Sequence, residues 1–141
     1  MSDEMQGPEL DYAFLAEYAR VEDDGLTAVG ASYTQVAVAT LPVTYTIYVA
    51  GRFRTPQNAD PFSVAVTFDP GDDQSRVQLQ TTMDPQREGR PYAGKTGVTF
   101  AVGFPVHLPN PGLYEVRIEL NEVMVRRLAF SVNKIGAADP S

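Results

Sequence analysis

The stretch His107–Val132, HLPNPGLYEVRIELNEVMVRRLAFSV, decides the predicted fold because it contains two strands joined by a tight turn. One face of its first strand carries the apolar residues Tyr114, Val116, Ile118 and Leu120. The opposite face carries the charged residues Glu115, Arg117 and Glu119. Such alternation is typical of an antiparallel strand with one buried face. Asn121-Glu122 then supplies a two-residue hairpin turn.

The returning strand of this hairpin slips by one residue, because its next apolar series is Leu128, Phe130 and Val132. A single β-bulge at Arg126-Arg127, opposite Arg117, restores the alignment. The predicted opposite pairs are Leu120–Val123, Ile118–Val125, Val116–Leu128 and Tyr114–Phe130. The alternative is a three-residue loop with one register throughout, which turns Arg126 inward and needs Val123 near positive φ.

The same period of two recurs along the rest of the chain, which favours strands over helices. The other expected strands are 10–21, 26–39, 43–53, 62–68, 76–82 and 97–106, with Gly30 at a bulge or close backbone approach and Pro105 ending the last of them. The longest expected loop is Asp84–Thr96, and it is the segment expected to be mobile. About eight strands and no convincing helix predict an antiparallel two-sheet immunoglobulin-like sandwich, with a closed barrel as the alternative.

The composition bounds the domain count and excludes several classes of function. The 141 residues suit one domain, expected at residues 10–133 with loose tails at 1–9 and 134–141. Eleven basic against 18 acidic residues give a net charge of −7, which disfavours nucleic acid and anionic membranes as partners. The absence of cysteine excludes disulfides and thiolate sites. No apolar run approaches the roughly 18 residues of a membrane span, and the acidic start is unlike a signal peptide, so a cytoplasmic location is expected.

Several motifs together resemble a known family. They are the alternating first strand, the acidic turn with Gly25, LTAVGASYTQV and the late LPNPGLYEVRIELNEVMVRRLAFSV. This pattern is similar to a family of small bacterial proteins, frequent in actinobacteria and known as a domain of unknown function. The resemblance covers roughly residues 10–133, although residues 54–95 match nothing in it. It implies a β-sandwich and brings no activity, cofactor or catalytic residue.

The candidate chemistry is weak at each position. His107 is the only histidine, and a metal site needs several donors, so we interpret it as structural or exposed. Glu115 and Glu119 flank Arg117 and favour an exposed charged ladder over a glycosidase pair. The acidic turns 22–24 and 69–73 are explained by turn chemistry, with calcium as the alternative. No catalytic residue, metal or cofactor is therefore predicted.

Two groups of residues are candidate binding sites. Tyr45, Tyr48 and Arg52 form a candidate interface. Their strand, Val43–Phe53, is apolar or aromatic on both faces, so it is either central or covered by a partner. Arg87, Arg90 and Tyr92 form a candidate loop site, in which residues 84–96 act as a lid.

These observations favour a non-catalytic protein–protein interaction module whose partner is another protein or a second copy. The alternatives are a structural subunit of a larger phage or secretion-type assembly, which rests on fold analogy alone, and a small-ligand binder that uses the 84–96 loop.

Overall fold

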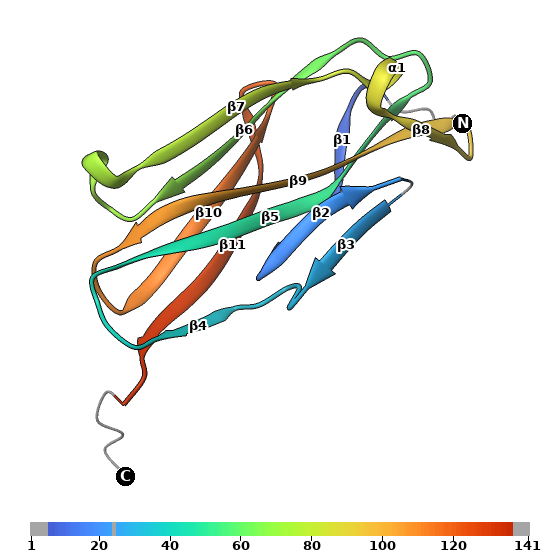
Figure 1. Ribbon diagram of the computed structural model, residues 1–141. Helices are drawn as coiled ribbons and strands as arrows, with labels where there is room; N and C mark the ends of the chain where they lie inside the picture. Colours follow the sequence, from blue (N-terminus) through green and yellow to red (C-terminus); the bar gives the residue numbers. More distant parts are fainter. Residues whose placement is uncertain (1–5, 24, 137–141) are drawn as a thin grey trace.

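The computed structural model describes residues 6–23 and 25–136, and most of them lie in strands (Figure 1). The elements are β1 (Glu9–Ala16), β2 (Tyr18–Glu22), β3 (Gly25–Val29), β4 (Gln35–Val38), β5 (Val43–Pro56), β6 (Phe62–Asp69), the 3₁₀ helix η1 (Asp73–Ser75), β7 (Val77–Met83), α1 (Pro85–Glu88), β8 (Arg90–Tyr92), β9 (Lys95–Leu108), β10 (Gly112–Leu120) and β11 (Val123–Lys134). The described residues thus hold eleven strands rather than the predicted eight. Neither helix in this part of the chain is long and apolar enough to cross a membrane.

Two open sheets make up the body of the protein. The first sheet has the strand order β1-β5-β9-β8, and the second sheet has the order β4-β11-β10-β6-β7. All neighbouring strands are antiparallel except β4 and β11, which run parallel. Both sheets end in edge strands, so the closed-barrel alternative is wrong.

The hydrophobic core lies between the two sheets. Its buried side chains come from the inward face of each strand, as the period of two predicts. The predicted series Phe62, Val64, Val66 and Phe68, and the series Tyr114, Val116, Ile118 and Leu120, are all buried. Phe68 lies at the centre, with its ring stacked 5.8 Å from Tyr114 and 6.4 Å from Phe130. Three aromatic core residues of the second sheet therefore form one row across neighbouring strands.

A hairpin of β2 and β3 adds a layer on the outer face of the first sheet (Figure 1). The chain leaves the first sheet after Ala16, which divides the predicted strand 10–21 into β1 and β2. The predicted strand 26–39 is divided as well, because Gly30 turns the chain with a φ of 60°. Ala19 of the hairpin packs on Ala16 and Ala50, and all three are buried. Val43–Phe53 was expected to be either central or covered by a partner; β5 is central, between β1 and β9, and the chain's own hairpin packs on its outer face.

The closing hairpin has the predicted turn and a corrected register. Asn121 and Glu122 have φ values of 49° and 70°, as a type I′ turn requires. The pairs Leu120–Val123, Val116–Leu128 and Tyr114–Phe130 are confirmed. The predicted pair Ile118–Val125 is wrong, because Ile118 lies opposite Arg126 and the irregularity falls between Ile118 and Glu119. Val125 is therefore the extra residue, and Arg117 lies in regular register opposite Arg127.

The segment 84–96 is structured, which corrects the expectation of a long loop. Asp84 begins α1 by accepting a hydrogen bond from the backbone N–H of Gln86, and Pro85 occupies the first turn. The Glu88 carboxylate accepts the backbone N–H of Asp84, which closes this short helix. After α1, the strand β8 pairs with the beginning of β9.

Two predicted boundaries also change. β9 continues through Pro105 to Leu108. β8 pairs only with residues 95–97, so the rest of β9 is an edge strand on that side. The missing backbone N–H of Pro105 is tolerated at such an edge. Glu9 and Lys134, predicted to lie in tails, belong to β1 and β11. The rest of the predicted tails lies partly outside the described residues, as does Asp24 of the first acidic turn.

Two tyrosines that contact Phe130 provide a matched test of this packing. The Tyr114 hydroxyl donates to the carbonyl of Asn110 at 2.6 Å, whereas the buried Tyr33 hydroxyl has no hydrogen-bond partner in the described structure. We expect Tyr114→Phe to lower the free energy of unfolding by about 1–2 kcal/mol, because a buried hydrogen bond is lost. Tyr33→Phe is expected to be neutral or slightly stabilising. Urea unfolding of both variants checks this, and equal losses would contradict the assigned hydroxyl contacts.

Candidate functional site

The structure brings together residues from both predicted sites in one stack on the outer face of the first sheet. The Arg52 guanidinium lies between two tyrosine rings, 5.4 Å from the Tyr12 centroid and 4.9 Å from the Tyr92 centroid. Gly97 leaves room for this arrangement, because a Cβ there would lie 3.2 Å from both Arg52 Cδ and Tyr92 Cε1. The stack joins β1, β5 and β8 by cation–π contacts.

Ion pairs engage the same arginine from the side. The Asp11 carboxylate accepts hydrogen bonds from both Nε and Nη2 of Arg52, and the Nε distance is 2.9 Å. Arg54 pairs with Glu9 at 2.9 Å and with Asp11 at 3.5 Å. The hydrogen bond to Asp11 raises the pKa of Arg52, and the hydrogen bond to Glu9 raises the pKa of Arg54. Because Arg52 already has a carboxylate and two rings as partners, this cluster fastens β1 and β8 to the sheet.

The other predicted site residues lie in different surroundings. Tyr45 packs against the main core, and burial raises its pKa. Tyr48 lies beneath the β2–β3 hairpin, with its ring 5.2 Å from that of Tyr18. Arg87 lines a hollow beside α1, whereas Arg90 donates to the carbonyl of Asp23. The predicted loop site is therefore divided, since Tyr92 contacts Arg52 instead.

The candidate metal positions are explained by local hydrogen bonds. Asp69 accepts the Gly71 backbone N–H at 2.8 Å, and this bond, with the nearby Arg76 and Arg117, lowers the pKa of Asp69. His107 is exposed and lies opposite Thr44 in the first sheet. Across residues 6–23 and 25–136, no three His, Cys, Asp or Glu side chains are grouped to hold a metal ion.

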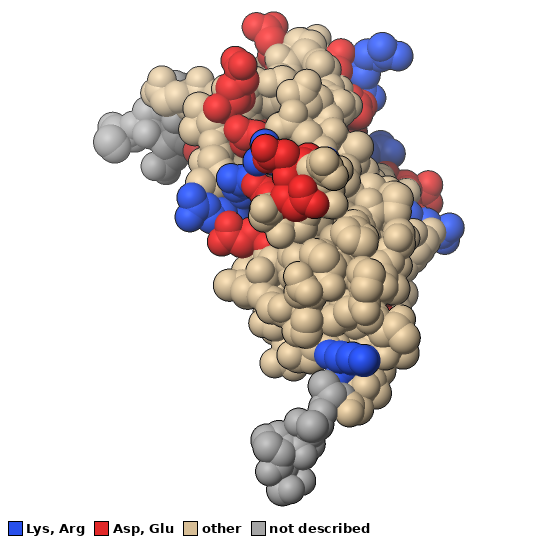
Figure 2. All heavy atoms as spheres, turned by 90° about the vertical axis from the view of Figure 1, so that its left-hand side faces the viewer, with Lys and Arg blue, Asp and Glu red and all other residues tan. Residues whose placement is uncertain are grey.

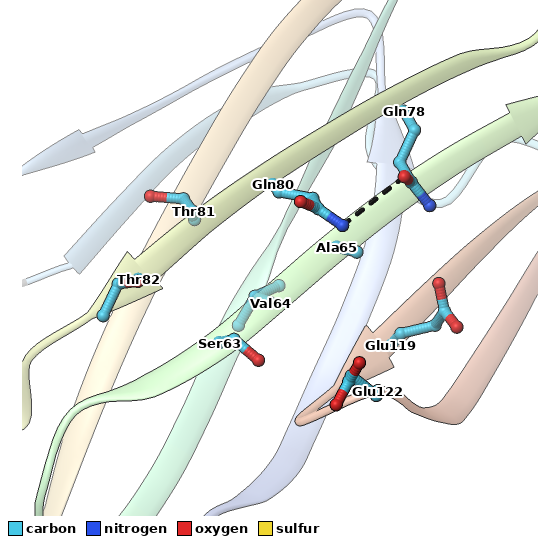
Figure 3. A pocket seen from close by; sticks show the side chains of 9 residues that line it. All are labelled: Ser63, Val64, Ala65, Gln78, Gln80, Thr81, Thr82, Glu119 and Glu122. Carbon is cyan, nitrogen blue, oxygen red and sulfur yellow. Dashed lines mark hydrogen bonds between the residues drawn. The ribbon is translucent and has the colours of Figure 1, made fainter.

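A groove on the outer face of the second sheet is lined mainly by polar side chains. It encloses 620 Å³ and is lined by Ser63, Val64, Ala65, Gln78, Gln80, Thr81, Thr82, Glu119 and Glu122 (Figure 3). The strand β6 forms its floor, β7 forms one wall, and the end of β10 with its turn forms the other (Figure 3).

The groove follows from side-chain size along three paired strands. Ala65 lies opposite Glu119 on one side and opposite Gln80 on the other, so a methyl group separates two long polar side chains. Ser63 is the next outward residue of β6, and its backbone N–H donates to the Asn121 side chain at 3.0 Å. That bond fixes the hairpin turn, and with it Glu122, at the rim of the groove.

Adjoining hollows extend the groove across the second sheet. One hollow shares Thr82 with it and reaches Arg87 and Glu88. Another shares Gln78 and Glu119 with it and reaches Met124 and Arg127. The face is therefore concave over several strands, as an extended ligand requires.

Charged side chains are unevenly distributed over the face of the molecule that Figure 2 shows. Figure 2 shows Asp, Glu, Lys and Arg gathered over the upper part of the molecule, and a lower part that is almost uncharged. Within the described chain, neither Glu119 nor Glu122 has an ion-pair partner. The groove therefore presents two carboxylates that are free to bind a cation.

The sequence signals for this site were present but incomplete. The alternation of Phe62–Phe68 predicts that Ser63 and Ala65 face outward, and Glu119 was already assigned to an outer face. The groove was missed because its walls come from β7 and β10, and the sequence does not reveal that both flank β6.

Comparisons with known proteins give a family and distant structural likenesses. The model of a family of unknown function, DUF6941, matches residues 11–133. No curated protein matches the chain. The solved structure of Pseudomonas fluorescens alkylpurine DNA glycosylase AlkC, bound to DNA containing an abasic site analog, is 10% identical with a TM-score of 0.41. That alignment covers 71% of this chain and 28% of the glycosylase chain, so the chain spans less than a third of its length.

Proposed function

Because the chain belongs to DUF6941, a family of unknown function, we propose a function from its geometry. The protein is a non-catalytic, immunoglobulin-like module that binds an extended, basic polypeptide segment in the groove of the second sheet. The observation that carries this proposal is the groove itself, with Glu119 and Glu122 on one wall and amide side chains on the other.

The immunoglobulin-like assignment is supported by topology and by one tyrosine. Sheets of four and five strands, with β4 parallel to β11, resemble the two-sheet arrangement of such domains. Tyr114 stands near the start of β10, and its hydroxyl bonds back to Asn110 four residues upstream. A tyrosine corner of this kind is a hallmark of immunoglobulin folds.

A polypeptide suits the groove because a peptide backbone needs both donors and acceptors. Gln78, Gln80 and Thr82 face outward along β7 and supply amide and hydroxyl groups of both kinds. The carboxylates of Glu119 and Glu122 favour a lysine or arginine of the bound segment. Charge complementarity of this type gives specificity and fast association.

A small ligand fits this surface less well. Small-molecule sites are mostly apolar and bury most of their ligand, whereas this groove is polar and continues into neighbouring hollows. Its lining contains no aromatic ring on which a sugar would stack. These properties favour an extended partner.

The test is selection of random dodecapeptides displayed on phage by the immobilised protein. We expect the recovered peptides to be enriched in Lys or Arg. We also expect Glu119→Lys to weaken their binding at least about tenfold, because an attractive contact becomes a repulsive one. Ala65→Trp is expected to block binding by filling the floor of the groove.

Glu115→Lys is the matched control, since it makes the same charge change on an outward position of the same strand, outside the groove lining. Circular dichroism of all variants reports whether they fold. Recovery of peptides without basic residues would contradict the proposal, as would equal binding by the Glu119→Lys and Glu115→Lys variants.

A further inference from the structure

The first half of β11 is exposed and has a free edge. Residues 123–128 pair with β10 alone, because β4 pairs only with Ser131–Lys134. Three consecutive apolar side chains begin this segment, and Val123, Met124 and Val125 are 64%, 40% and 37% exposed. Consecutive exposed apolar residues on a free strand edge are characteristic of a contact surface.

The charges that flank this apolar triplet in one copy are complementary to those in a second copy. The sequence Glu122-Val123-Met124-Val125-Arg126 has an acid at one end and a base at the other. When two such segments align antiparallel about Met124, each Glu122 faces Arg126 of the other copy. The same alignment places each Val123 against the other copy's Val125. The contact is therefore isologous, with each patch meeting its own copy.

The two charged residues are available for this contact. Glu122 and Arg126 are both exposed, and neither forms an ion pair within the described parts of the chain. Arginine and a bulge at a strand edge normally oppose pairing with a neutral strand. Glu122 of a second copy would neutralise Arg126, so this edge selects its own sequence over others.

We propose that two copies of this chain associate through the tips of their β10–β11 hairpins, with Met124 at the two-fold axis. The apolar triplets pack against each other, and two Glu122–Arg126 ion pairs flank them. The two surfaces meet at the hairpin tip, because Glu122 also lines the groove and Met124 lines the hollow beside it. The inference does not depend on the bound segment, since self-association is measured on the protein alone.

Charge reversal tests the register directly. Glu122→Arg and Arg126→Glu are each expected to weaken self-association at least about tenfold, since both ion pairs become like-charge contacts. A 1:1 mixture of the two variants is expected to form a heterodimer, because the two arginines of the first variant then face the two glutamates of the second. Sedimentation velocity over a range of concentrations, with one variant carrying a mass tag, distinguishes these species.

Glu115→Arg is the control for net charge, and it is expected to leave self-association unchanged because position 115 lies toward the opposite end of β10. The double variant E122R/R126E is expected to associate like the wild type. A wild-type protein that stays monomeric at millimolar concentration would overturn the proposal. Single variants that associate like the wild type, or a mixture without heterodimer, would do the same.

Discussion

Replacing Phe68 with alanine is expected to lower the free energy of unfolding by about 3–5 kcal/mol. The Phe68 side chain is fully buried, and its ring stacks on Tyr114 and Phe130 from the two neighbouring core positions. Removal of the ring leaves a cavity between two sheets that cannot move together without breaking strand pairs. The loss combines the transfer of apolar area with the cost of that cavity.

Equilibrium urea unfolding, followed by circular dichroism, measures this effect. The matched control is Leu113→Ala on the adjacent strand β10, where the leucine side chain is 69% exposed. Its expected effect is within about 0.5 kcal/mol. A Phe68→Ala variant as stable as the control would show that the sheets do not pack as described.

Replacing Gly51 with valine is expected to lower the free energy of unfolding by about 3 kcal/mol or more, because the backbone of the neighbouring strand β1 approaches this position closely. A Cβ at Gly51 would overlap the backbone oxygen of Tyr12 and lie 2.9 Å from the Cα of Ala13. The obstructing atoms belong to the backbone, at the point where the register of β1 shifts between Leu10 and Tyr12. β1 must therefore move away, which also opens the Asp11–Arg52 contact.

Hydrogen exchange localises this second effect, since the amides of β1 should exchange faster while those of β10 stay protected. Gly25→Ala is the control, because a Cβ there meets no atom within 4 Å. Protection of β1 unchanged in Gly51→Val would contradict the close approach of the two strands.

The sequence predicted that the chain forms β-sheets, and it predicted the buried face of most strands. The alternation of apolar and polar residues within a strand is enough to identify that face. Phe62–Phe68 and Tyr114–Leu120 each have one apolar face, and those faces are the ones buried. The turn at Asn121-Glu122 was predictable for a similar local reason, since two residues separate two patterned runs.

The β2–β3 hairpin could not be separated from the neighbouring strands by the same reasoning. Tyr18 and Val21 continue the alternation of β1, yet they lie in a different layer. Periodicity shows which face of a strand is apolar, but it does not show to which sheet the strand belongs. The one available signal was the apolar character of both faces of Val43–Phe53, which indicated a strand that is central or covered by a partner. That pattern did not predict that a hairpin of the same chain lies on it.

The bulge position depended on a packing choice that alternation does not make. A bulge at Val125 or at Arg126-Arg127 restores the pair Val116–Leu128 equally well. In the structure the extra residue comes earlier, and Arg126 lies opposite Ile118 near the exposed end of the hairpin. The guanidinium reaches solvent there, so the cost that disfavoured an inward Arg126 does not arise.

The candidate site was predictable only in part, because it combines residues from three strands whose order in the sheet is not local information. Arg52 and Tyr92 were identified separately and proved to be neighbours. The groove requires small residues on β6 between longer ones on β7 and β10, and this pattern appears only once the pairing is known.

The most direct test of the proposed binding surface is an amide chemical-shift map of the protein, titrated with a basic peptide recovered from the phage selection. The account predicts that the largest shift changes fall on Ser63, Ala65, Gln80, Thr82 and Glu119, which surround the groove. Changes centred on Arg52 and the outer face of the first sheet, with the groove residues unaffected, would contradict it.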